Sequence, residues 1–238
     1  KGNNMKNVIS MVCFLILYGC TNQLEINKSK VDKAFNKTNL PFAVLGVSLD
    51  KNDPVFYSYG DSNPDAIFEI ASMTKAITST AVMQLVEEGK IDLDLSIEEY
   101  LPEINQIKIL NKDLSSSERD IPITMRHLLT HTSGFVYFFN SLRVMEDLGM
   151  SPGDWPQPEA LSPDEYDWGF NAPQPRQIFE AGDRWHYGRS LGIAGRVIER
   201  VSGLDLDTYF KENILEPLGM DRSGYNLSQS VRNDLMPM

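Results

Sequence analysis

Hydrophobic and polar positions along the chain follow two different periods, and together they predict a mixed α+β protein. Residues 42–49 (FAVLGVSL) form an apolar, β-branched run, and the polar turn Lys-Asn-Asp-Pro follows at 51–54. Residues 55–59 resume the same character as the first run. Two such runs around a short polar turn predict a β-hairpin over 42–59.

Beyond Ser72 the apolar spacing is that of helices. Ile77, Ala81 and Leu85 recur every four residues, and Gly89 is placed to end this helix as a C-cap. Shorter helices are expected over residues 29–36, from Ser96, over 125–130 with Thr124 as N-cap, over 190–201, and over 205–213.

The segment 139–178 interrupts this regular pattern. It contains six of the thirteen prolines, together with Trp155 and Trp168. A segment of this length that is broken by proline is either a functional lid or a disordered insert. The two tryptophans favour an ordered lid.

The start of the chain has the pattern of a signal peptide. Residues 1–4 precede Met5, which we take as the start, and 8–18 form an uncharged apolar run. This run is shorter than the roughly 20 residues that span a bilayer, but it is typical of a signal peptide. The run ends in Leu-Tyr-Gly-Cys at 17–20, which resembles the lipobox of bacterial lipoproteins. The resemblance implies cleavage before Cys20 and its lipidation; the alternative is an ordinary signal peptide.

The expected organisation follows from this reading. Residues 1–19 are a signal peptide with its upstream residues, 20–40 are a lipidated cysteine and a polar tether, and 41–238 are the functional domain. Such a protein would be anchored through lipid to a bacterial membrane of the cell envelope, at the outer membrane by analogy with the family.

Composition excludes two other classes of protein. The chain has 22 basic and 33 acidic residues, a net charge of −11, so it lacks the basic surface that a nucleic-acid-binding protein needs. Its two cysteines, Cys13 and Cys20, both lie in the first twenty residues. The body of the protein therefore has no disulfide framework.

Ser72 and Lys75 are the first candidates for catalysis. They form an S-x-x-K sequence, which is common by chance, and Ser48 and Lys51 form a second one. Ser72 differs because it stands at the start of a predicted helix, where positions i and i+3 share a face. A serine becomes a nucleophile when a base takes its proton, and a lysine serves as base when its pKa is lowered. The alternative is that Ser72 only caps the helix.

Several motifs resemble the serine β-lactamase and penicillin-binding-protein superfamily, especially the class C-related branch with carboxylesterases and acyltransferases. They occur in the family's order, at residues 68–75 (FEIASMTK), 85–94 (LVEEGKIDLD), 100–103 (YLPE), 127–135 (HLLTHTSGF) and 216–220 (EPLGM). The resemblance implies an antiparallel sheet flanked by helices, plus a helical subdomain.

The second motif of that branch, Tyr-x-Asn, does not occur in the chain. Trp-His-Tyr-Gly-Arg-Ser at 185–190 stands in its place and is similar to the esterase form Tyr-Gly-x-Ser. The resemblance therefore implies that Tyr187 shares the role of base with Lys75. Arg189 replaces the Asn, which favours esters over β-lactams. It would either lower nearby pKa values or be a surface arginine. Tyr137 is expected at the substrate entrance, although core packing is the alternative.

The family's third motif, Lys-Thr-Gly or His-x-Gly on a late strand, is absent from the chain. The resemblance places that strand, and one N–H of the oxyanion hole, beyond Met238. We therefore expect a C-terminally truncated domain that lacks these strands.

No cofactor or metal is expected. His127 and His131 have the i, i+4 spacing of half a zinc site, but no third ligand cluster accompanies them. The sequence thus predicts a serine hydrolase that forms an acyl-enzyme on Ser72 and acts on small esters. The alternatives are a β-lactamase or D-Ala-D-Ala carboxypeptidase acting on an amide, and a catalytically inactive binding lipoprotein.

Overall fold

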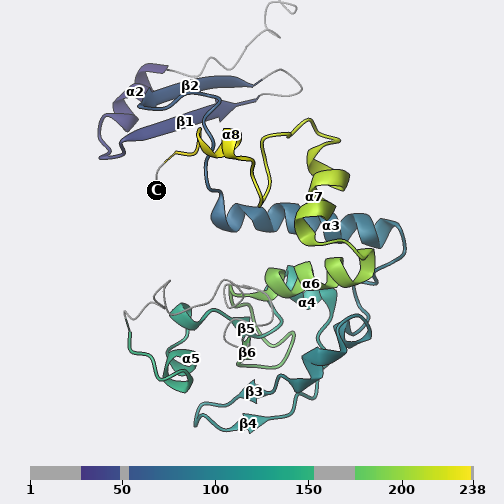
Figure 1. Ribbon diagram of the computed structural model, residues 1–238. Coiled ribbons are helices and arrows are strands. Elements are labelled where there is room, and N and C mark those ends of the chain that lie inside the picture. Colours follow the sequence, from purple (N-terminus) through teal and green to yellow (C-terminus); the bar gives the residue numbers. More distant parts are fainter. Residues whose placement is uncertain (1–27, 49–53, 153–174, 237–238) are drawn as a thin grey trace, which may run out of the picture. The chain divides into compact units, whose positions relative to one another are not determined.

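The computed structural model describes residues 28–48, 54–152 and 175–236 (Figure 1). The predicted signal peptide, Cys20 and the centre of the proline-rich segment lie outside these residues. The chain divides into two compact units. The second unit is Glu69–Arg232, and the first unit consists of the residues before and after it in the sequence. Among the described helices, none is both long and apolar enough to cross a membrane.

The first unit contains the predicted hairpin. β1 (Phe42–Val47) pairs antiparallel with β2 (Val55–Gly60), with Phe42 opposite Gly60. The preceding helix α2 (Lys28–Phe35) is joined to β2 by a ring stack between Phe35 and Tyr59, whose centroids are 4.8 Å apart. The predictions of a hairpin and of a short helix before it are thus confirmed.

The second unit is mostly helical. Its helices are α3 (Thr74–Glu87), α4 (Met125–Leu129), α5 (Leu142–Asp147), α6 (Ser190–Ser202), α7 (Leu206–Phe210) and α8 (Gln229–Arg232). Its short turns are the 3₁₀ turns at Ala71–Met73, Ile97–Glu99, Pro102–Gln106 and Phe138–Asn140, and a π-helical turn at Lys211–Leu215 that continues α7.

The main core of this unit lies around α3 and α6, and both helices show why the sequence pattern was informative. α3 buries Thr78, Ala81, Val82 and Leu85, the i, i+3, i+4, i+7 stripe of an amphipathic helix. α6 likewise buries its apolar face against α3 and α4. It ends at Gly203, whose φ of 76° is the left-handed C-cap conformation that favours glycine.

A small four-stranded sheet in the second unit was not predicted from the sequence. Its strands are β3 (Ile109–Leu110), β4 (Ser116–Ser117), β5 (Phe135–Val136) and β6 (Arg176–Gln177), in the order β4-β3-β6-β5. Two pairings are antiparallel, whereas β3 and β6 run parallel. A second apolar cluster packs under this sheet and α5.

Both ends of the proline-rich segment therefore belong to the second unit. Its N-terminal part forms α5, and its C-terminal part supplies β6 at the centre of the small sheet. The prediction that the segment is a lid falls on residues 153–174 and stays untested. Ser96 does cap a helix, as expected, but the helix is a 3₁₀ turn. The α+β class is confirmed.

Candidate active site

Ser72 lies on a strained turn immediately before α3. It is the central residue of the 3₁₀ turn Ala71–Met73, and the α-helix itself begins at Thr74. Ala71 has a φ of 41°, which L-residues other than glycine rarely adopt and which costs of order 1–3 kcal/mol. Ser72 is exposed, and its Oγ accepts a hydrogen bond of 3.2 Å from Lys75 Nζ. The alternative that Ser72 caps α3 is wrong, because the N-cap residue is Met73.

Two tyrosines complete the surroundings of the Lys75 ammonium group. Lys75 Nζ donates a hydrogen bond of 3.2 Å to the Tyr137 hydroxyl. The same nitrogen lies 5.0 Å from the centroid of the Tyr187 ring and 5.7 Å from that of Tyr137. The two rings are 5.9 Å apart. The structure thus brings Ser72, Lys75, Tyr137 and Tyr187 together, although the last two lie far from α3 in sequence.

The pKa shifts at this site indicate where a proton is held. Burial alone would lower the pKa of Lys75, but hydrogen bonds to Tyr187 and Tyr137 outweigh it and raise this pKa. Burial alone would raise the pKa of Tyr187, but hydrogen bonds to Ser72 and Lys75 lower it. The condition for Lys75 to act as the base, a lowered pKa, is therefore not met. Lys75 is the cation of the site, and the Tyr187 hydroxyl is the group whose proton is easier to remove.

Arg189 is not among the causes of the pKa shifts of Lys75 and Tyr187. It is the N-cap residue of α6 and is half-buried, so it is not a surface arginine. Burial lowers its pKa, and among the site residues its charge is coupled to Tyr137. The shifts of Lys75 and Tyr187 have other causes, named above.

Tyr187 is held by contacts on both sides of its peptide unit. The Tyr187 carbonyl oxygen accepts a hydrogen bond of 2.8 Å from the Asn140 side chain. Gly188 passes so close to β5 that a Cβ on it would lie 2.1 Å from the Phe135 carbonyl oxygen. Ser190, at the start of α6, is fully buried, and its hydroxyl lies 2.8 Å from that of Ser133. Glycine and serine in Tyr-Gly-x-Ser are therefore required by packing.

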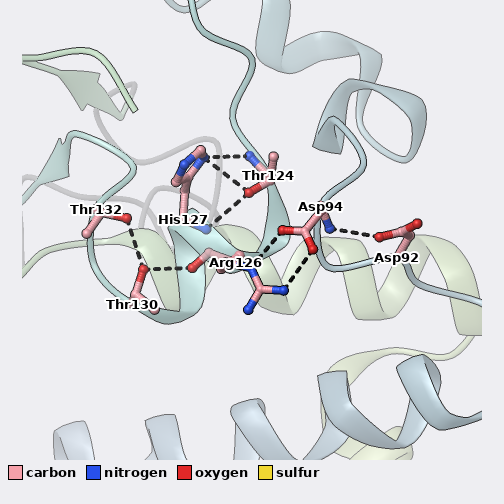
Figure 2. A network of polar contacts seen from close by, with 7 residues as sticks. All are labelled: Asp92, Asp94, Thr124, Arg126, His127, Thr130 and Thr132. Carbon is pink, nitrogen blue, oxygen red and sulfur yellow. Dashed lines mark hydrogen bonds and ion pairs between the residues drawn. The ribbon is translucent and has the colours of Figure 1, made fainter. Parts of the chain in front are cut away.

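The His-Thr-Ser-Gly segment at 131–134 follows a well-fixed helix, α4 (Figure 2). Thr124 and His127 form a capping box at the start of α4, so Thr124 is the N-cap, as predicted. Arg126 makes a bidentate ion pair with Asp94, with both N···O distances at 2.7 Å. At the other end of α4, the hydroxyls of Thr130 and Thr132 lie 2.9 Å apart. These contacts define where the chain enters the segment 131–134.

The two histidines of this region have different partners. His127 Nδ1 faces Thr124, whereas His131 Nδ1 accepts a hydrogen bond from the Gly188 N–H. Within residues 28–48, 54–152 and 175–236, no three His, Cys, Asp or Glu side chains form a group that would hold a metal ion.

Sequence reasoning found Ser72, Lys75 and Tyr187, but it missed how Tyr187 is held. The motif containing His131 was interpreted as helix-end packing, and no pattern pointed to Asn140. Tyr137 was expected at the substrate entrance, which stays a prediction, and the structure adds that its hydroxyl accepts a hydrogen bond from Lys75.

Comparison with known proteins gives consistent matches. The Beta-lactamase family model matches residues 30–236. The acyltransferase calJ of Penicillium decumbens is 38% identical over 195 residues, covering 77% of this chain and 44% of calJ. The lovastatin esterase of Penicillium rubens is 32% identical over 175 residues, covering 70% of this chain and 42% of the esterase.

Solved structures agree with the sequence matches. Unliganded simvastatin synthase LovD from Aspergillus terreus superposes with a TM-score of 0.60 at 28% identity, over 79% of this chain and 50% of that one. The chain thus spans half or less of the length of these relatives.

Proposed function

The chain belongs to the Beta-lactamase family, as its motifs predicted, and from this premise we propose that it is a serine acyl hydrolase acting on small carboxylic esters. One observation carries the proposal: the Lys75 ammonium group lies between the Ser72 hydroxyl and two phenols, with 3.2 Å to Ser72 Oγ and 3.2 Å to Tyr137 Oη. The names of two relatives, an acyltransferase and an esterase, support acyl transfer at the family level.

Acylation begins with a proton transfer from Ser72 to the Tyr187 phenolate. The Ser72 oxygen then attacks the ester carbonyl, and the tetrahedral intermediate collapses as the bond to the leaving alcohol breaks. Tyr187 gives its proton to the departing alkoxide. Lys75 keeps its charge throughout and stabilises each negative oxygen in turn. The Ser72 N–H, at the N-terminal end of α3, supplies part of the oxyanion hole.

Deacylation follows the same path with water in place of the alcohol. Tyr187 takes a proton from water, the hydroxide oxygen attacks the acyl carbon, and the bond to Ser72 Oγ breaks. Ser72 recovers its proton from Tyr187, so the net reaction converts ester and water to acid and alcohol. An acceptor alcohol that replaces water would receive the acyl group instead, which is the reaction for which the acyltransferase relative is named.

Labelling with a fluorophosphonate probe and hydrolysis of p-nitrophenyl butyrate test the proposal. We expect the wild-type chain to be labelled and to hydrolyse the ester, and Ser72→Ala to lose both. Ser48→Ala is a matched control, because Ser48 heads the other S-x-x-K sequence. Labelling that survives in Ser72→Ala contradicts the mechanism, and an unlabelled wild-type chain favours the binding lipoprotein. Turnover of nitrocefin in place of the ester would favour a β-lactamase.

We also propose that the chain is lipid-anchored through Cys20. This rests on the apolar run and the lipobox-like residues 17–20. Metabolic labelling with a palmitate analogue in a bacterial host tests it: incorporation is expected in the wild type and absent from Cys20→Ser. Equal incorporation in both would contradict it.

A further inference from the structure

His131 contacts the residues on both sides of Tyr187, and the proposed reaction does not use these contacts directly. The His131 carbonyl oxygen accepts a hydrogen bond of 2.9 Å from the His186 N–H. Its Nδ1 accepts a second bond of 3.4 Å from the Gly188 N–H. These two N–H groups are those of the residues immediately before and after Tyr187. One histidine therefore fixes the backbone on both sides of the proposed base.

The ring of His131 also packs against the base itself. Its centroid lies 4.7 Å from that of the Tyr187 ring, at an interplanar angle of 45°. On another side it meets Trp185 edge-on at 6.3 Å. Contacts at such distances restrict the rotation of the Tyr187 ring, and so restrict where its hydroxyl lies relative to Ser72 and Lys75.

The backbone of His131 adopts a conformation that is uncommon for residues other than glycine. Its φ is 56°, in the left-handed region, where glycine is the favoured residue and asparagine, aspartate and histidine are the most frequent of the others. A histidine here costs about 1–2 kcal/mol relative to glycine. The conformation aims both the carbonyl oxygen and the ring at the Tyr187 segment, so the strain accompanies a specific placement.

The contact with Gly188 requires an uncharged ring. Nδ1 can accept a hydrogen bond only when it carries no proton, which places the remaining proton on Nε2. Burial and the nearby charge of Lys75 both lower the pKa of His131. Besides Tyr187, the titratable groups around His131 are Lys75 on α3, Tyr137 after β5 and His186 before α6.

We propose that His131 is a positioning residue, which holds the Tyr187 hydroxyl against Ser72 and Lys75 through its carbonyl oxygen, its Nδ1 atom and its ring. The inference rests on the proposed function, because it assigns a task in the same reaction. Without these contacts Tyr187 gains freedom to leave Lys75. Its pKa then rises toward its ordinary value of 10.0, since hydrogen bonds to Ser72 and Lys75 are what lower it.

Three substitutions separate positioning from backbone strain. His131→Asn keeps an acceptor at the branch position of Nδ1 and tolerates the positive φ. His131→Gly relieves the strain but removes the acceptor and the ring. His131→Ala removes both and keeps the strain. His127→Asn is the matched control, because His127 lies four residues earlier, inside α4, and its ring faces Thr124 instead of Tyr187.

Two measurements on the full chain serve as readouts. The first is the rate of Ser72 labelling by a fluorophosphonate as a function of pH. The second is the pKa of Tyr187 from ¹³Cζ-tyrosine NMR, with the resonance assigned by Tyr187→Phe, which does not depend on any activity. We expect His131→Ala and His131→Gly to label about tenfold more slowly, with the rate profile and the Tyr187 pKa both moved upward. His131→Asn and His127→Asn should stay within about threefold of the wild type.

The outcomes separate this inference from the proposed function. An unchanged Tyr187 pKa in His131→Ala overturns the positioning role. So does His131→Gly matching His131→Asn, since only the backbone conformation would then matter. If the wild type is not labelled but the Tyr187 pKa still shifts in His131→Ala, the proposed function fails and the positioning role stands.

Discussion

Adding one methyl group to Gly188 is the most direct perturbation of the site, because it moves Tyr187 without altering any reactive group. A Cβ at this position would lie 2.1 Å from the Phe135 carbonyl oxygen and 2.6 Å from the Val136 Cα atom. Both atoms belong to the backbone of β5, which is paired to β6 and fully buried. They cannot turn away as the end of a side chain would, so the segment that carries Gly188 must move.

The size of the movement follows from the contact distances. Ordinary van der Waals contact begins near 3.4 Å, so the 2.1 Å contact requires a displacement of roughly 1 Å or more. Tyr187 is the adjacent residue and shares this displacement. Misplacing a catalytic group by about 1 Å costs on the order of 100-fold in rate. Overpacking at a buried site costs about 1–3 kcal/mol in the free energy of unfolding.

We therefore expect Gly188→Ala to reduce Ser72 labelling by about 100-fold while the chain stays folded. Urea unfolding, followed by circular dichroism, measures the loss of stability. Gly203→Ala is the matched control: it places alanine at a φ of 76°, but a Cβ there meets nothing within 4 Å. It should lose about 1 kcal/mol of stability and label at the wild-type rate. A Gly188→Ala variant that labels as fast as Gly203→Ala would refute the close packing of Tyr187 against β5.

Three further outcomes are expected. Tyr187→Phe should slow labelling of Ser72 by about 10²–10⁴-fold as the base is lost, and Tyr137→Phe should slow it much less; equal losses would mean that the two phenols share the role. Ser190→Ala should lower the free energy of unfolding by about 1–3 kcal/mol in urea titrations, because it leaves the buried Ser133 hydroxyl without its 2.8 Å partner; a loss below about 0.5 kcal/mol would contradict this. The pKa of His131 is lowered on folding, so the unfolded chain binds this proton at a higher pH than the folded chain does. The free energy of unfolding should therefore fall as pH drops from 6.5 through the lowered pKa. Urea midpoints measured at about pH 7.5 and about pH 5.5 should differ less in His131→Asn than in the wild type.

Local structure was largely predictable because it depends on neighbours in the sequence. The hairpin β1–β2, the helix α3 and the helix α6 each have a clear apolar period and turn residues at their ends. Thr124 was predicted as an N-cap from its local chemistry, and it starts α4. The start of α3 was misplaced by two residues, because a 3₁₀ turn shares the side-chain spacing of the first helical turn.

The small sheet was not predictable by the same reasoning. β3 and β6 are two residues long, so neither shows an alternating pattern, and their pairing joins Ile109 to Gln177 near the far end of the proline-rich segment. Such pairings depend on the tertiary fold. The same limit applies at Lys75: the S-x-x-K spacing predicted its contact with Ser72, but the two phenols that raise its pKa come from distant segments.

The position of the proton follows from how two helices meet. Lys75 lies in the first turn of α3, Tyr187 lies just before the first turn of α6, and the two helices pack together. Lys75 Nζ is 5.0 Å from the centroid of the Tyr187 ring, so a side chain from the start of α3 meets one from the segment just before α6. The N-terminal end of α3 carries about half a positive charge from its macrodipole, in addition to the full charge of Lys75. Every species that the proposed reaction forms here, whether phenolate, alkoxide or oxyanion, is negative. The start of α3 and the ammonium group of Lys75 stabilise all three, which is why a base with an ordinary pKa of 10.0 is a reasonable choice at this site.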